Sequence, residues 1–107
     1  MHVITREELA QKLQNGDDFK LVMTMDEVAF RQAHIPKSMN IYRLEDALAR
    51  LQPDDDIVVY CTHEACIASA MAYRLLKDHG YRRVRRYAGG LSDWTEAGYP
   101  LAGEPAT

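Results

Sequence analysis

Residues 56–80 read DIVVYCTHEACIASAMAYRLLKDHG and carry the clearest structural pattern in this chain of 107 residues. After its aspartate, the run at 56–60 is continuously apolar, which is typical of a strand buried on both faces of a parallel sheet. A segment with helical spacing of its apolar residues follows and stops at Gly80, a residue type that favours helix ends. Between the two lies a loop that begins with Cys61. The pattern therefore predicts a strand, a loop and a helix, with a thiol where the strand ends.

Helical and extended segments alternate along the rest of the chain. Helices are expected over 6–16, 26–33, 43–52 and 89–98, and strands over 19–24, 39–41 and 84–88. Thr5 and Glu8 form a capping box at the start of the first helix. This alternation predicts an α/β fold, with one domain over 1–107, a mostly parallel central sheet flanked by helices, and a loosely ordered tail at 102–107.

Charge and hydropathy narrow the classes of partner. The net charge of −3 gives no general reason to expect nucleic acid or an anionic membrane. No apolar run is long enough to span a bilayer, and the first residues do not resemble a secretory signal, so the expected location is the cytoplasm. The exception to the acidic balance is RRVRR at 82–86, which is expected to be a solvated, positively charged strand edge.

The position of Cys61 favours chemistry over a structural role. Two cysteines five residues apart do not make a disulfide framework, so both thiols are expected to be reduced at rest. Ligands of open α/β sheets bind beyond the carboxyl ends of the strands, where a sharp loop and the start of the next helix favour a thiolate and hold an anion beside it. Cys61 is therefore predicted to be the nucleophile. The expected anion-binding loop consists of Thr62, His63, Glu64, Ala65, Cys66 and Ile67.

Three segments of the chain resemble the rhodanese-like sulfurtransferases and stand in the order of that family. They are FRQAHIPKSMNI at 30–41, DIVVYC at 56–61 and LLKDHGYRRVRRYAGGLSDWTEAGYPLAG at 75–103. The resemblance implies that Cys61 takes a sulfane sulfur from thiosulfate or a small persulfide, holds it as a persulfide, and passes it to a thiol or cyanide. A protein could also accept the sulfur, and no cofactor or metal is expected.

The loop departs from the usual pattern of the family. Members usually carry glycine and arginine in it, with an arginine five residues after the cysteine, whereas this loop contains Glu64 and no cation, and Cys66 stands at the arginine position. The aspartate and arginine that usually end the second strand are Met23 and Met25 here. Because thiosulfate is a dianion, a loop without a cation predicts weak use of thiosulfate.

Three features within the segments that resemble the family are predicted to be structural. His34 is expected to shape the turn before Pro36, and Trp94 is expected to anchor the last helix in the core. The pair Gly89-Gly90 is expected to provide backbone geometry close to the loop.

Two other roles can be considered for the same loop. A phosphatase role fails, because a phosphatase of related fold needs arginine six residues after its cysteine and Ile67 stands there. Cys61, His63 and Cys66 could ligate a metal, although no fourth ligand is evident.

Two residues of the loop and the function itself also have more than one interpretation. His63 either tunes Cys61 or faces solvent. Cys66 either packs as a small apolar residue or acts as a resolving thiol toward Cys61. In place of an enzyme, the chain could be a non-catalytic or redox-regulatory rhodanese-like module that binds a protein partner.

Overall fold

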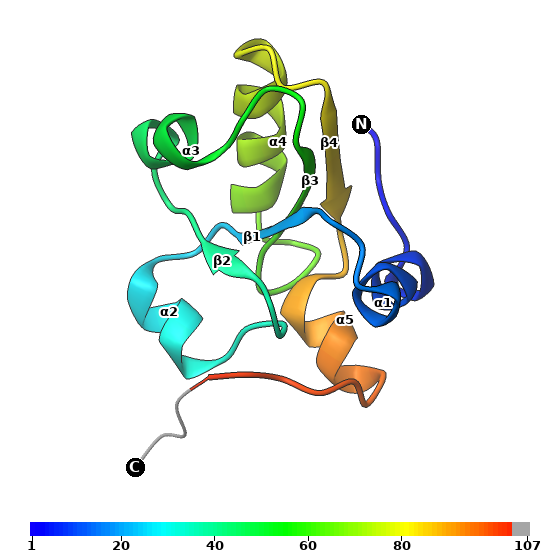
Figure 1. Cartoon of the computed structure of the whole chain (residues 1–107). Coiled ribbons are helices and arrows are strands. Elements are labelled where there is room, and N and C mark those ends of the chain that lie inside the picture. Colours follow the sequence, from blue (N-terminus) through cyan, green and yellow to red (C-terminus); the bar gives the residue numbers. More distant parts are fainter. Residues whose placement is uncertain (104–107) are drawn as a thin grey trace.

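A four-stranded, all-parallel sheet forms the centre of the computed structural model, which describes residues 1–103 (Figure 1). The strands lie in the order β2-β1-β3-β4. Their bounds are β1 Lys20–Met23, β2 Met39–Asn40, β3 Asp56–Tyr60 and β4 Arg83–Tyr87. The helices of this part of the chain are α1 Arg6–Asn15, α2 Glu27–Gln32, α3 Leu44–Arg50, α4 Ala68–Asp78 and α5 Gly90–Glu96. The predicted α/β class, the parallel sheet and the order of elements are confirmed.

The central strand β3 separates two hydrophobic clusters because successive side chains of a strand point to opposite faces. Ile57 and Val59 pack on the side of α3 and α4, in one cluster with Leu51 and Leu76. Val58 and Tyr60 pack on the side of α1 and α5, in a second cluster. The second cluster contains Leu9 and Trp94, so the predicted core role of Trp94 is confirmed by its exposure of only 3%.

Capping explains where α1 begins and ends. The hydroxyl of Thr5 accepts from the amide of Glu8, and the carboxylate of Glu8 accepts from the amide of Thr5, so the predicted capping box is confirmed. The amide and the hydroxyl of Thr5 both donate to the carboxylate of Glu8, and these two hydrogen bonds lower the pKa of Glu8. The helix ends at Gly16, whose φ of 70° lies in the left-handed region.

The segment before Pro36 is held by its neighbours in space. The ring of His34 stacks on Phe30, and its Nδ1 lies 2.7 Å from the carbonyl oxygen of Phe30. The backbone of His34 also exchanges two hydrogen bonds with Ala102, which confirms a structural role for this histidine. Ala102 belongs to the tail that was expected to be loosely ordered, and the tail residues 104–107 lie outside the described part of the chain.

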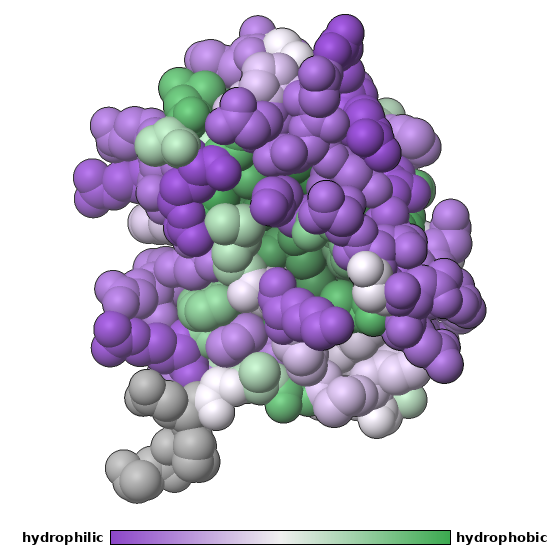
Figure 2. All heavy atoms as spheres, in the orientation of Figure 1, coloured by the Kyte–Doolittle hydropathy of each residue, from purple (hydrophilic) through white to green (hydrophobic). Residues whose placement is uncertain are grey.

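The surface that Figure 2 presents is largely hydrophilic, with apolar side chains exposed near the centre of that face. Among the helices at 1–103, none is long and apolar enough to cross a lipid bilayer.

The basic run at 82–86 differs from its prediction. Arg82 and Arg83 are exposed, as expected for a solvated edge of the sheet, whereas Arg85 and Arg86 are half-buried. Arg85 Nη2 lies 3.3 Å from the carboxylate of Asp56, and Lys12 Nζ lies 2.7 Å from the same group. Burial opposes ionisation of Asp56, but the bonds and charges of these two cations outweigh it and hold its pKa below the usual value.

We expect the Asp56→Asn variant to be less stable than the wild type by about 1–2 kcal/mol at pH 7, because it leaves Lys12 and Arg85 without their shared anion. A carboxyl group with a lowered folded-state pKa stabilises the fold above its unfolded pKa of about 4 and loses that effect as pH falls. Urea unfolding at several pH values should therefore show the two proteins converging below about pH 4.

The matched control for this prediction is Asp54→Asn. Asp54 pairs with Arg82 at an exposed site, where the side chain of Asp54 is 78% accessible. Its removal should change the free energy of unfolding by less than about 1 kcal/mol at any pH. Equal losses in the two variants would show that the Asp56 cluster contributes no more than a surface ion pair.

Candidate functional site

The central strand β3 delivers Cys61 to the carboxyl edge of the sheet. Cys61 follows Tyr60 directly, and only 1% of its surface is accessible. The sulfur of Met25 lies 3.3 Å from Cys61 Sγ, and the hydroxyl of Thr62 lies 3.9 Å from it. Met25 follows β1, the neighbour of β3 in the sheet, which explains how a residue distant in sequence covers the cysteine. The sequence analysis did not identify this contact of Met25.

Cys61 and Cys66 are joined by a disulfide bond, with a distance of 6.3 Å between their Cα atoms. The two thiols that are predicted from the sequence to be reduced are therefore oxidised in this structure. The loop turns back on itself because the amide of Cys66 donates to the carbonyl of His63 over 3.1 Å. This turn brings the two sulfurs together, which the spacing in the sequence alone does not show.

The start of α5 holds the loop from one side. The amide of Leu91 donates to the carbonyl of Cys61 over 2.9 Å, and the amide of Ser92 donates to the carbonyl of Thr62 over 2.8 Å. Gly90 directly precedes Leu91 and Ser92, and a Cβ added there would come within 2.6 Å of the carbonyl oxygen of Cys61. The predicted role of Gly90 in backbone geometry next to the loop is confirmed.

Arg86 holds the loop from a second side. Its Nη2 donates to the carbonyls of Glu64 and Cys66, each over 3.3 Å, and its Nε donates to the hydroxyl of Ser69 over 2.8 Å. The sequence analysis missed this role. The signal lay in the register of the sheet, because Arg86 of β4 pairs with Val59 of β3, two residues before the cysteine.

These contacts fix the orientation of the peptide groups in the loop. The carbonyls of Cys61, Thr62, His63, Glu64 and Cys66 each accept a hydrogen bond from α5, from Arg86 or from within the loop. In a planar trans peptide, the N–H group that follows a carbonyl points in the opposite direction. The amides that follow these carbonyls therefore point away from the groups that hold the loop.

The side chains of the loop are mostly in solvent. His63, Glu64, Ala65 and Ile67 are exposed, while Thr62 is half-buried. Within residues 1–103, no group of three His, Cys, Asp or Glu residues is placed to hold a metal ion. The two cysteines share a disulfide here, so neither offers a thiolate ligand in this form.

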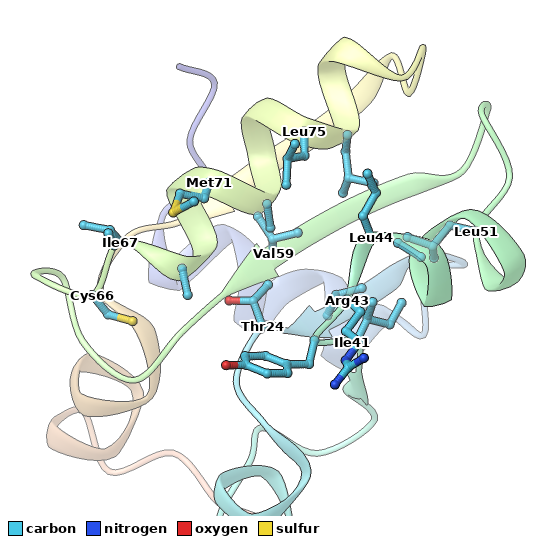
Figure 3. Close-up of a pocket in the computed structure, with 16 residues that line it drawn as sticks. Thr24, Ile41, Arg43, Leu44, Leu51, Val59, Cys66, Ile67, Met71 and Leu75 are labelled. Atoms are coloured by element: carbon cyan, nitrogen blue, oxygen red, sulfur yellow. The ribbon is translucent and has the colours of Figure 1, made fainter.

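A cavity of about 430 Å³ adjoins the loop between α3 and α4 (Figure 3). Cys66 and Ile67 lie at its margin on the loop side, and Arg43 lies on the side of α3. The floor is formed by sheet residues, among them Val59 of β3. The sequence alone does not reveal this cavity, because its lining comes from helices and strands that are far apart in the chain.

Comparison with known proteins places this architecture in a family. Residues 5–97 match the Rhodanese-like domain. Thiosulfate sulfurtransferase 18 of Arabidopsis thaliana is 32% identical over 105 residues, which cover 83% of this chain and 74% of the plant protein. The solution structure of the Rhodanese-like domain from the Anabaena sp. Alr3790 protein has a TM-score of 0.87 at 24% identity and covers 97% of this chain and 80% of that one.

A further relative is named as a regulator. The HTH-type transcriptional regulator Rv0324 of Mycobacterium tuberculosis is 37% identical over 100 residues. The matched part covers 92% of this chain and 43% of the regulator, so this chain spans less than half the length of that relative.

We expect Gly90→Ala to destabilise the protein by about 2–4 kcal/mol, since it adds a Cβ against the Cys61 carbonyl at a residue with a φ of 66°. Gly80→Ala is the matched control, because Gly80 has a φ of 90° but no atom within 4 Å of the added Cβ. The control should lose only the cost of left-handed backbone, about 1–2 kcal/mol. Denaturant unfolding measures both losses, and equal losses would mean that α5 does not press on the loop.

Proposed function

Because this chain belongs to the rhodanese-like domain family, we propose that it is a sulfurtransferase in which Cys61 carries sulfane sulfur as a persulfide. The observation that carries the proposal is the place of Cys61 at the end of the buried strand β3, under a loop held by α5 and Arg86. The name of the Arabidopsis relative, a thiosulfate sulfurtransferase, supports the class of reaction.

The chemistry begins from the reduced form. The Cys61 thiolate attacks the outer sulfur of a donor persulfide, the sulfur–sulfur bond of the donor breaks, and the donor leaves as a thiolate. A thiol or cyanide acceptor then attacks the outer sulfur of the Cys61 persulfide, and Cys61 leaves as a thiolate. Loop amides that point away from the supporting contacts would stabilise the terminal anionic sulfur at both stages.

Cys66 offers a second reaction by which the Cys61 persulfide can lose its outer sulfur. A Cys66 thiolate that attacks Cys61 Sγ forms the Cys61–Cys66 disulfide and releases the outer sulfur as hydrosulfide. The disulfide of the structure is the protein product that such a step would leave. Cys66 is therefore proposed as a resolving thiol that ends each cycle when no acceptor is bound.

The proposed donor is a small persulfide, with weak use of thiosulfate. Arg86 is the cation that touches the loop, but its guanidinium donates to the carbonyls of Glu64 and Cys66. The positive charge of Arg86 therefore lies on the carbonyl side of the loop, opposite to the amides that follow these carbonyls. Glu64 is exposed and adds a negative charge to the loop, which disfavours a dianion more than a monoanion.

A redox-regulatory module is the second candidate, and two observations favour it. The disulfide occupies the proposed nucleophile and would switch sulfur transfer off under oxidising conditions. The matched part of the mycobacterial relative belongs to a protein whose name is that of a transcriptional regulator. In this role the chain would report redox state to a protein partner through the two forms of the loop.

The persulfide proposal predicts that reduced protein gains the mass of one sulfur atom when it is mixed with a small persulfide, and that Cys61→Ser gains none. Cys66→Ser is the matched control. It should gain the same mass and keep it longer than the wild type, because no second thiol releases the sulfur. Intact-mass spectrometry measures both results. A gain that survives in Cys61→Ser would move the chemistry to Cys66 and refute the assignment.

The charge of the loop predicts the response to thiosulfate. Glu64→Arg should lower the KM for thiosulfate about two- to fivefold, and the effect should shrink with added salt. Asp78→Arg, which makes the same change of charge at the exposed far end of α4, serves as the control and should leave the KM unchanged. Steady-state kinetics with cyanide as acceptor measures both, and the same KM in the wild type and Glu64→Arg would mean that Glu64 does not act on the bound anion.

A further inference from the structure

We propose that the cavity between α3 and α4 binds a small thiol with an apolar body and one anionic group, and that this thiol reduces the disulfide by attacking Cys66. The inference goes beyond sulfur transfer at Cys61, because it concerns the step that makes the reduced form. It requires only the cavity and the disulfide.

The cavity has the size and lining of a small-molecule site. Its volume of about 430 Å³ lies in the range that holds drug-sized ligands. The floor includes side chains that are almost fully buried, among them Val22, Val59 and Leu51, so the cavity lies directly over the hydrophobic core. The rim carries Met71 and Leu75 of α4, which are both exposed (Figure 3). An apolar ligand body would cover these side chains and fill the hollow.

Of the two cysteines in the disulfide, Cys66 alone lines this cavity. Cys66 is half-buried and lines the cavity. Cys61 is 1% accessible, does not line the cavity, and is covered by Met25 and Thr62. Access decides which sulfur of a disulfide a thiolate attacks. A thiol bound in the cavity would therefore attack Cys66 and release Cys61.

A positively charged residue in the lining of the cavity favours a ligand that carries an anionic group. Arg43 is the lining residue with a full charge, and within residues 1–103 the structure records no ion pair for it. Arg43 comes from the start of α3, and its guanidinium lies on the side of the cavity away from α4 (Figure 3). The side chain is exposed, so it can turn toward a carboxylate at one end of a ligand whose thiol end contacts Cys66.

The reaction balances with two ligand thiols. The first ligand thiolate bonds to Cys66 Sγ, the bond between the two cysteines breaks, and Cys61 leaves with its electron pair as a thiolate. A second ligand thiolate attacks the sulfur of the bound ligand, and Cys66 leaves as a thiolate. Two thiols are oxidised to one ligand disulfide, the protein disulfide is reduced to two thiols, and the two protons pass from the ligands to the cysteines.

The test compares three thiols as reductants of the oxidised full chain, without any sulfur donor. Mercaptooctanoate has the apolar body and the carboxylate, mercaptooctanol has only the body, and 2-mercaptoethanol has neither. At equal thiolate concentration, mercaptooctanoate should reduce the disulfide about tenfold faster than 2-mercaptoethanol or more, since buried methylenes strengthen binding. It should also reduce the disulfide about two- to fivefold faster than mercaptooctanol, because its carboxylate pairs with Arg43. Alkylation followed by intact-mass spectrometry gives the rates.

Variants of two arginines and the position of the mixed disulfide test whether the thiol binds in the cavity and attacks Cys66. Arg43→Gln should remove the advantage of mercaptooctanoate over mercaptooctanol, whereas Arg74→Gln, an exposed cation of α4 outside the cavity, should preserve it. Acid quenching followed by peptide mapping should find the first mixed disulfide on Cys66. Equal rates for the three thiols, or a mixed disulfide on Cys61, would overturn the proposal. Neither result would bear on whether the reduced Cys61 accepts sulfur.

Discussion

Burial of β3 on both faces is the constraint on which the site depends. Ile57, Val58, Val59 and Tyr60 have no accessible surface, and each fully buried apolar side chain stabilises a fold by about 1.5–3 kcal/mol. A strand fixed in this way cannot slide, because a shift of one residue would exchange the side chains of its two faces. Cys61 follows as the next residue, so the packing of the core sets the position of its sulfur.

The same constraint explains how much could be predicted from the sequence. The apolar run of β3, the capping box of α1 and the glycine after α4 are local signals, and each predicted its element correctly. The contacts of the site are not local. Met25 reaches Cys61 from the neighbouring strand, and Arg86 reaches the loop from β4 through the register of the sheet. Reasoning from the sequence treated Arg86 as part of a charged edge because its partners are backbone carbonyls, which leave no pattern of side chains.

Contacts from outside the loop fix its backbone, although the loop itself contains no cation. Family members usually place an arginine in the loop itself, and this chain places Cys66 at that position. Arg86 instead fixes the loop from outside, together with the amides of Leu91 and Ser92. The supporting groups bond to carbonyls, so they orient the loop without adding a charge on the side of its amides. An anion bound there, as proposed, would be held by backbone amides without a cation, which favours anions of low charge.

Cys66 is shared by two structures, since it is half of the disulfide and part of the wall of the cavity. Its sulfur cannot change partner without changing that wall. Any compound that binds the oxidised and reduced forms with unequal affinity must shift the equilibrium between them, and by thermodynamic linkage the two effects have the same size. Binding of such a compound in the apolar cavity and reduction of the disulfide are therefore linked, so that each changes the equilibrium constant of the other.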